Sequence, residues 1–271
     1  MPKKQIVMCP PDFYNIEYSI NPWMDTGNTV IKENALKQYN KLKTSFENAS
    51  AEITELPPVK GLPDMVYATN AGYAGNNIFI KANFKAAQRK YEADEAEKFF
   101  AKKGFDIFTM PGDIAFEGEG DLIRSESKYF LGCGIRSDEK AAEILGKIIG
   151  KEIVPLELVN PYFYHLDTCF GPINDDLVVI NPVAFSDNSL KTIHAKFKNV
   201  IFANEQDNSV LGCNLIVTGT NVFLGSGISD ILRTGILSFG YSVNEIKMSE
   251  FLKGGGSVKC LSLEVFQDNY T

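Results

Sequence analysis

A unit of about 40 residues recurs along this chain and limits the folds that it can adopt. Each copy reads as short apolar strands, an amphipathic helix and a further strand. Four regular copies lie between residues 76 and 248, and a less regular fifth copy lies at residues 6–58. Repeats of this kind favour a radial arrangement over one doubly wound sheet. We therefore expect an α/β fold in which residues 1–271 form a single domain.

The copy at residues 128–158 carries clear helix signals. Apolar residues of 139–150 recur at the 3.6-residue spacing of an amphipathic helix. Gly150 would end this helix, because glycine readily adopts the left-handed conformation of a C-cap. Ser137 and Asp138 precede the helix and are the candidates for its N-cap.

The chain is acidic, with 34 Asp and Glu against 27 Lys and Arg and a net charge of −7. No nucleic-acid partner is expected, because such proteins present a basic face. The sequence has no apolar run of about 18 residues, so no membrane span is expected. The N-terminus lacks the apolar stretch of a secretory signal, so no such signal is expected. Since no glycine-rich phosphate loop occurs, no cofactor is expected.

The five cysteines are an odd number, are scattered and include no CxxC pair. This pattern predicts neither a disulfide framework nor a metal site. A reducing, cytoplasmic compartment is therefore expected. The exposed sheet edges of such repeats also predict a homo-oligomer.

Three carboxylates lie close together in the sequence FEGEGD: Glu117, Glu119 and Asp121. On an extended backbone alternate side chains point to the same side, so these groups would crowd together. They would form either a solvated acidic turn or a cage for a cation, in which one carboxylate moves protons. The apolar neighbours Phe116 and Leu122 favour the cage.

Only two histidines are available for proton transfer. His165 lies in an aromatic stretch with Asp167 two residues further on, whereas His194 lies within an amphipathic helix and reads as a surface residue. A carboxylate can set the orientation and charge of a histidine that acts as a general acid or base. His165 is the candidate for that role, and the alternative is a hydrogen-bonded histidine of the core.

Asp64 and Asn70 are six residues apart in the sequence PDMVYATNAG. On a strand this even spacing places both side chains on one face. They would reach into one pocket as a pair of acceptors, or they would belong to an ordinary turn at the end of a strand.

Cys260 follows the glycine run Gly254–Gly256 near the end of the chain. A buried cysteine is commonly inert. A glycine run, however, lets backbone N–H groups point at a bound group. A cysteine is nucleophilic as a thiolate, which requires a nearby positive charge. In this acidic chain a bound cationic substrate would supply that charge.

These residues together describe one chemistry, in which carboxylates hold a planar cation, a cysteine attacks it and a histidine moves protons. A guanidinium fits this description, because its N–H donors pair bidentately with carboxylates.

Seven segments resemble the guanidino-group-modifying superfamily, the pentein enzymes that fold as five-bladed α/β propellers of ββαβ repeats. In chain order they cover nearly the whole sequence and read CPPDFYNIEYSINPWM, LPDMVYATNAG, AAQRKYE, FEGEGD, GCGIRSD, YHLDT and GGGSVKCLSLE. The superfamily includes arginine deiminases, dimethylarginine dimethylaminohydrolases, amidinotransferases and ornithine-forming arginine dihydrolases.

The resemblance implies three catalytic residues. Cys260 would be the nucleophile, His165 the general acid and base, and Glu117 the acid that holds the guanidinium and takes protons. Family members usually have three residues from this glutamate to the following aspartate, whereas the step from Glu117 to Asp121 is four. Glu119 is therefore the alternative to Glu117.

The resemblance also implies a substrate-binding set. Asp64 would bind the guanidinium nitrogens, and Arg89 and Arg136 would bind the α-carboxylate. Many deiminases and dimethylarginine hydrolases have an acid where this chain has Asn70, so the pair Asn21 and Asn70 is more similar to the arginine dihydrolases. The set is completed by Asp167 and Glu119.

We therefore expect a hydrolase that converts arginine, by way of citrulline, to ornithine, carbon dioxide and ammonia through a thiouronium intermediate on Cys260. The alternatives are a dimethylarginine dimethylaminohydrolase, a citrulline-forming arginine deiminase, an amidinotransferase and a non-catalytic binding protein of the same fold.

Overall fold

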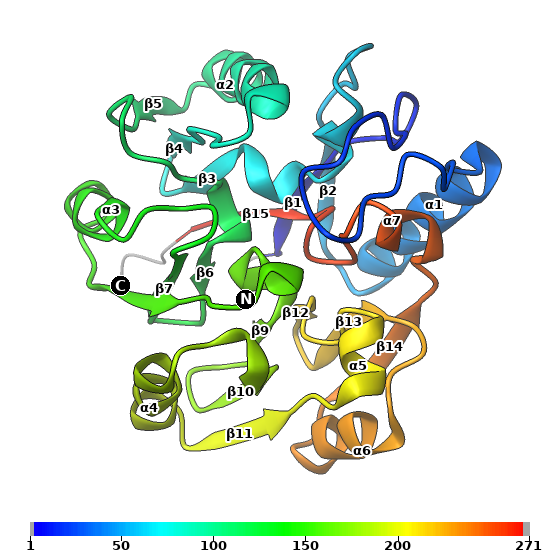
Figure 1. The fold of residues 1–271 in the computed structure, drawn as a ribbon, viewed down its shortest axis with the longest axis vertical. Helices are drawn as coiled ribbons and strands as arrows, with labels where there is room; N and C mark the ends of the chain where they lie inside the picture. The colour runs from blue at the N-terminus through cyan, green and yellow to red at the C-terminus, as the bar shows by residue number, and fades with distance from the viewer. Residues whose placement is uncertain (1–2, 268–271) are drawn as a thin grey trace.

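The computed structural model describes residues 3–267, whose helices and strands form five similar modules around a common centre (Figure 1). In each module two antiparallel strands are joined by a third strand that runs parallel to the second. The helix that connects the second and third strands lies at the periphery (Figure 1). The predicted α/β propeller of ββαβ repeats is thus confirmed.

Four modules are continuous in sequence. The first contains β3 (Gly72–Gly75), β4 (Ile78–Lys81), α2 (Lys90–Lys102) and β5 (Asp106–Thr109), and the second contains β6 (Leu122–Arg124), β7 (Tyr129–Cys133), α3 (Ala141–Ile149) and β8 (Ile153–Glu157). The third contains β9 (Phe170–Pro172), β10 (Leu177–Ile180), α4 (Asp187–Lys196) and β11 (Asn199–Phe202). The fourth contains β12 (Ile216–Thr218), β13 (Asn221–Gly225), α6 (Asp230–Ser238) and β14 (Ser242–Ile246). Two short helices connect modules, α5 (Glu205–Ser209) and α7 (Ser249–Leu252).

The remaining module is built from both ends of the described chain. It contains β1 (Gln5–Met8), α1 (Lys32–Asn48) and β2 (Glu52–Glu55), and it takes its first strand, β15 (Leu263–Phe266), from the C-terminal end. β15 runs antiparallel to β1 and parallel to β3, so one six-stranded sheet unites two modules. The repeat at residues 6–58 lacks this strand, which explains why it is less regular in the sequence.

The helix signals near α3 have mixed outcomes. Gly150 ends the helix with a φ of 73°, as its C-cap role predicts. The N-cap prediction is wrong, because the helix begins after Lys140, which makes no side-chain cap. The Ser137 hydroxyl instead donates to Asp121, and the Asp138 carboxylate accepts the N–H of Ala115.

Aromatic side chains pack between two neighbouring modules, those of β6–β8 and β9–β11. Phe130 lies in β7, Phe170 lies in β9 and Phe197 follows α4. Their ring centroids lie 5.0 to 5.8 Å apart. All three rings are buried, and aromatic pairs at these distances add to the stabilisation from apolar burial. Packing of this kind fixes the modules, and therefore the loops at their inner ends, relative to one another.

The segments that carry the predicted site form short 3₁₀ turns, which cover Pro63–Val66, Ala68–Ala71, Gly118–Gly120 and Leu166–Thr168. The expected strand at residues 64–70 and the expected extended backbone at 117–121 are therefore wrong. Within residues 3–267, no helix combines the length and apolar character needed to cross a membrane.

Candidate active site

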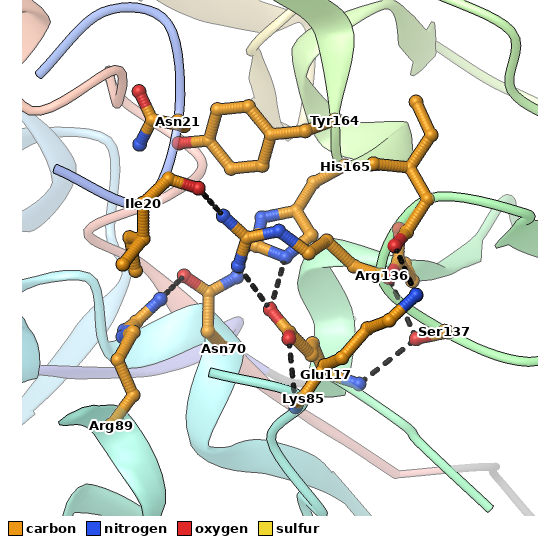
Figure 2. Close-up of polar contacts among 12 residues, drawn as sticks. Ile20, Asn21, Asn70, Lys85, Arg89, Glu117, Arg136, Ser137, Tyr164 and His165 are labelled. Carbon is orange, nitrogen blue, oxygen red and sulfur yellow. Dashed lines mark hydrogen bonds and ion pairs between the residues drawn. The ribbon is translucent and has the colours of Figure 1, made fainter. Parts of the chain in front are cut away.

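His165 and Glu117 lie at the centre of the predicted site. Nε2 of His165 is 2.7 Å from Oε2 of Glu117, and its Nδ1 is 3.4 Å from Nδ2 of Asn70. Arg136 donates to the same Glu117 oxygen at 3.0 Å and to the backbone oxygen of Ile20 at 2.7 Å. Figure 2 shows these side chains pointing toward one another from segments far apart in the sequence.

The contacts of His165 fix its neutral tautomer. Burial lowers the pKa of His165 to about 4, although Glu117 opposes this shift. Burial also disfavours the charge on Glu117, but the hydrogen bond from His165 and the charge of Arg136 outweigh it and lower the carboxyl pKa to about 2. A neutral imidazole with its proton on Nε2 donates to Glu117 and accepts from Asn70 through Nδ1.

Cys260 forms a second cluster with Asp167 and Asn214. The Cys260 sulfur lies 3.0 Å from Oδ2 of Asp167 and 3.2 Å from Nδ2 of Asn214. Asp167 is two residues from His165, so one short loop carries both the imidazole and the carboxylate that faces the sulfur. Both Cys260 and Asp167 are buried.

The electrostatics around Cys260 favour the protonated thiol. Burial raises the pKa of Cys260 well above its ordinary value, and the adjacent Asp167 raises it further, whereas hydrogen bonds from the Ser257 backbone and Asn214 oppose the rise. Burial likewise raises the pKa of Asp167 to about 6, against the hydrogen bond from Cys260. A cation bound between the two groups would favour both ionised forms.

The glycine run before Cys260 has a different role from the one expected. The N–H groups of Gly254, Gly255 and Gly256 bond to carbonyls of α7 and therefore do not point at a bound group. A Cβ atom at Gly256 would lie 2.3 Å from the ring of Tyr67, so a side chain does not fit there. The glycines thus allow a tight turn against an aromatic ring, and the next residue, Ser257, provides the backbone hydrogen bond to the sulfur.

Arg89 connects the two residues that were expected to share a strand face. It donates to Oδ1 of Asn70 at 2.9 Å and to the backbone oxygen of Asp64 at 3.2 Å. It also makes two hydrogen bonds to Glu92, at 2.8 and 2.9 Å. The Asp64 carboxylate accepts from Tyr18 at 2.9 Å, and burial raises its pKa despite the nearby Arg89.

Glu119 does not join Glu117 in this structure. Its Oε2 accepts from Nζ of Lys259 at 2.7 Å and from the N–H of Glu264 at 3.0 Å. The two glutamates diverge because Gly118 has a φ of 63° and lies so close to Asn70 that a Cβ atom would be 2.6 Å from its backbone oxygen. The extended backbone that would align the two carboxylates is therefore absent here.

The third acidic residue, Asp121, bonds to two segments of the site. Its carboxylate accepts from the Ser137 hydroxyl at 2.6 Å and from the N–H of Leu166 at 3.1 Å. The Ser137 oxygen in turn accepts the N–H of Glu117 at 2.9 Å. Asp121 thereby ties the Glu117 turn to the His165 loop.

Asn21 lies in an N-terminal segment that crosses the site. Its Nδ2 donates to the backbone oxygen of Gly254 at 3.1 Å, and Figure 2 shows it beside Tyr164. Tyr164 donates to the backbone oxygen of Gly255 at 2.9 Å, and its ring lies 4.8 Å from the guanidinium carbon of Arg136. Asn21 therefore contacts the glycine turn before Cys260, whereas Asn70 contacts His165.

His194 is exposed on α4, as the sequence predicts. Within residues 3–267 no group of three or more His, Cys, Asp or Glu side chains has the arrangement of a metal site.

Sequence reasoning missed several residues that organise the site: Asn214, Lys259, Glu92, Tyr164 and Tyr18. Asn214 lies outside the seven segments that carry the resemblance, whereas the other four lie within them but have common residue types to which no role was assigned. Tyr164 and Lys259 adjoin His165 and Cys260, and this adjacency is the one signal in the sequence that could have identified them.

The arrangement provides a nucleophile, a proton carrier and several buried anions around it. Cys260 supplies a sulfur next to a carboxylate, and His165 supplies an imidazole that can exchange a proton with Glu117. The carboxyl groups of Asp167, Glu117 and Asp64 suit a cationic substrate, whose charge would favour their ionised forms in a buried setting.

Comparison with known proteins places this geometry in a family. A family model described as N,N dimethylarginine dimethylhydrolase, eukaryotic, matches residues 15–267. An N(G),N(G)-dimethylarginine dimethylaminohydrolase of Mycobacterium tuberculosis is 33% identical over 97% of this chain and 86% of its own length. The bifunctional arginine dihydrolase/ornithine cyclodeaminase ArgZ of Synechocystis is 34% identical over 96% of this chain, which spans 37% of the length of that protein.

Solved structures agree with this relationship. The N-terminal domain of ArgZ, an arginine dihydrolase bound to product, matches with a TM-score of 0.94 and 32% identity, covering 98% of both chains. A dimethylarginine dimethylaminohydrolase structure shares the fold, with a TM-score of 0.78 and 20% identity. The chain therefore belongs to the dimethylarginine dimethylaminohydrolase family of guanidino-modifying pentein enzymes and is a hydrolase of guanidino C–N bonds.

Proposed function

We propose that this enzyme hydrolyses arginine, by way of citrulline, to ornithine, carbon dioxide and ammonia. The observation that carries the proposal is the amide of Asn70 against His165, which in turn contacts Glu117, next to the Cys260–Asp167 pair. An acid at position 70 would be typical of the citrulline-forming relatives named above. Overall, arginine and two water molecules would give ornithine, carbon dioxide and two ammonia molecules.

The first half of the reaction forms and breaks a bond to sulfur. The Cys260 thiolate attacks the guanidinium carbon while Asp64, Glu117 and Asp167 hold the charged group, and proximity supplies much of the rate. The proton that Cys260 loses passes to His165, and the resulting imidazolium delivers it to the departing nitrogen, which leaves as ammonia. Water, deprotonated by His165, then attacks the thiouronium carbon, the thiolate leaves, and citrulline is formed.

The substrate itself would generate the thiolate. The Cys260 thiol has a raised pKa because it is buried and lies beside Asp167. A guanidinium placed between Cys260 and Asp167 adds a positive charge, which lowers the pKa of the thiol. The thiolate fraction at neutral pH would therefore be much larger when a cation is bound.

The second half repeats the attack on the ureido carbon of citrulline. The thiolate displaces the second ammonia and leaves a thiocarbamate, which water cleaves to the carbamate of ornithine and then to carbon dioxide and ornithine. A ureido group is neutral and binds carboxylates less strongly than a guanidinium does. The amides of Asn70 and Asn21, which can both donate and accept, would keep it in place.

Arg89 and Arg136 are the proposed partners of the substrate α-carboxylate. Both are buried, and both already bond to carboxylates or backbone oxygens of the site. A substrate carboxylate would therefore compete with Glu92 and Glu117 for these guanidinium groups. Glu119 lies against Lys259 and has no direct part in this proposal.

A dimethylarginine dimethylaminohydrolase is the second candidate function. The matching family model and the Mycobacterium tuberculosis relative favour it. In support of the arginine dihydrolase, structures of ArgZ include a cysteine-to-serine mutant bound to substrate and an asparagine-to-serine mutant covalently bound to a reaction intermediate. Those residue types match the nucleophile and the amides proposed here.

Product analysis by mass spectrometry tests the proposal directly. Purified enzyme is incubated separately with L-arginine and with asymmetric dimethylarginine, and ornithine, citrulline, dimethylamine and ammonia are quantified. We expect ornithine with two ammonia molecules per arginine, and no turnover by a folded Cys260→Ser variant. Citrulline as the end product would support a deiminase, and preferred release of dimethylamine would support the second candidate.

An amidinotransferase differs only in the acceptor that replaces water. Adding glycine or lysine to the arginine assay would then yield a new guanidino product, which we do not expect. A non-catalytic binding protein would leave all substrates intact and would leave Cys260 unreactive toward a guanidine-mimicking alkylating agent such as 2-chloroacetamidine.

We also propose that the enzyme works in the reducing cytoplasm as a homo-oligomer. All five cysteines are unpaired and buried, which is consistent with a reducing compartment. Light scattering of the purified enzyme would test the assembly, and a monomeric mass at working concentration would contradict it.

A further inference from the structure

Asn214 joins the two halves of the site through a single side chain. It is fully buried just before β12, and its Oδ1 accepts the N–H groups of Lys259 at 2.8 Å and Cys260 at 3.2 Å. Its Nδ2 donates to the backbone oxygen of Asp167 at 2.9 Å and to the Cys260 sulfur at 3.2 Å. Two acceptor sites and two donors are all that an amide offers, so every hydrogen-bonding site of Asn214 is used.

We propose that Asn214 is a positioning residue for the nucleophile, which holds the Cys260 segment against the Asp167 loop and donates a hydrogen bond to the thiolate. This inference rests on the proposed function, in which Cys260 attacks the substrate. Neither the cysteine nor the histidine segment contains Asn214, which belongs to the module of β12–β14. It therefore fixes two segments of the site from a third.

The donor is the part of Asn214 that bears on reactivity. A hydrogen bond to an ionised group is about twice as strong as one between neutral groups, so Nδ2 stabilises the thiolate more than the thiol. The Ser257 backbone supplies a second hydrogen bond to the sulfur, and both counteract the unfavourable effect of Asp167. Loss of one such donor should lower the thiolate population about tenfold or more.

The acceptor is the part of Asn214 that has a purely structural effect. Oδ1 satisfies two buried backbone N–H groups that would otherwise lack partners at the turn before the nucleophile. An aspartate at this position keeps an acceptor for these N–H groups but removes the donor to sulfur. A serine removes most of the amide without adding charge. Both variants lack the amide donor, whereas the added charge is confined to aspartate and the loss of the amide acceptor to serine, so an effect common to both is assigned to the donor.

The experiment measures the thiol pKa of Cys260 in wild type, Asn214→Asp and Asn214→Ser. Alkylation rates with iodoacetamide are followed from pH 6 to pH 10 by peptide mass spectrometry, which distinguishes Cys260 from the other cysteines. Asn181→Asp is the matched control, because Asn181 is equally buried and its Oδ1 accepts from Val183 and Asn208 instead of contacting the site.

We expect the apparent pKa of Cys260 to rise by about one unit or more in both Asn214 variants and to stay unchanged in Asn181→Asp. The kcat/KM for arginine should fall about tenfold or more, with partial recovery at higher pH, where the thiolate is restored. An unchanged alkylation profile in the variants overturns the donor role, even if turnover falls. If Asn214→Asp does not fold, Asn214→Ser gives the same decision.

The outcome is independent of whether arginine is the substrate. Alkylation by a neutral reagent reports on the sulfur alone, so a raised pKa in the variants supports the inference even if the wild type leaves arginine intact. Conversely, normal turnover of arginine with unaltered alkylation in the variants would uphold the proposed function and remove Asn214 from it.

Discussion

Replacing Asp167 with asparagine should speed the reaction of Cys260 with a neutral alkylating agent and slow the hydrolysis of arginine. The Asp167 carboxylate lies 3.0 Å from the sulfur, and both groups are buried. It disfavours the thiolate when the site is empty, but it would attract a guanidinium when substrate binds. Asparagine removes the negative charge, keeps the shape and can donate a hydrogen bond to the sulfur.

The size of the effect follows from the distance. Two unit charges 3.0 Å apart interact with about 5.5 kcal/mol at an effective dielectric constant of about 20. Relaxation of the site and partial protonation of Asp167, whose pKa is about 6, reduce the repulsion that the substitution removes. We therefore expect the pKa of the Cys260 thiol to fall by about two units. The thiolate fraction then rises about 100-fold while its intrinsic nucleophilicity falls about tenfold, so alkylation near pH 7 should be about tenfold faster.

The assay compares iodoacetamide alkylation of Cys260 with arginine turnover in the same preparations. Turnover should fall about 10- to 100-fold, because the guanidinium loses a charge-assisted hydrogen bond. Asp207→Asn is the control, since Asp207 is also buried but accepts hydrogen bonds from Ser229 and Asn204. Equal alkylation rates in wild type and Asp167→Asn would refute the claim that this carboxylate controls the thiol.

Three further predictions concern stability and pH. Lys259→Met leaves Glu119 buried without its cation and should cost about 3–5 kcal/mol in the free energy of unfolding, measured in urea, with part of the loss recovered when Glu119→Gln is added. Gly256→Ala places a Cβ atom 2.3 Å from a tyrosine ring and should cost about 1–3 kcal/mol, whereas Gly112→Ala, which has open space, should cost much less. Because burial raises the pKa of Asp167 to about 6, this carboxyl becomes protonated below that pH, so kcat/KM should fall there by about tenfold per pH unit, and Asp167→Asn should lack this limb.

The fold could be predicted because its signal is local and repeated. Each continuous module carries its own strand and helix periodicity, and five copies of one pattern favour a radial arrangement. The exception is the pairing of β15 with β1, which joins the two ends of the described chain. Such a pairing depends on the closure of the whole ring, and nothing within residues 263–266 specifies its partner.

The acidic cluster could be located but not oriented from the sequence. The spacing of Glu117 and Glu119 predicts a shared face only for an extended backbone. The positive φ of Gly118 turns the chain, so Glu117 contacts His165 and Glu119 contacts Lys259. A glycine permits this conformation without requiring it, and the close approach of Asn70 that requires it is a tertiary contact.

The rare residue types of the site, histidine and cysteine, were easier to identify from the sequence than the residues that form hydrogen bonds to them. The sequence has two histidines and five cysteines, so the choice of proton carrier and nucleophile is limited to a handful of positions. Asn214 belongs to a common residue type, and its importance arises because two separate segments converge on the amide of a third. In this radial fold the side chains of the site come from several modules. The supporting hydrogen bonds therefore cross between modules, and they cannot be inferred from any one of them.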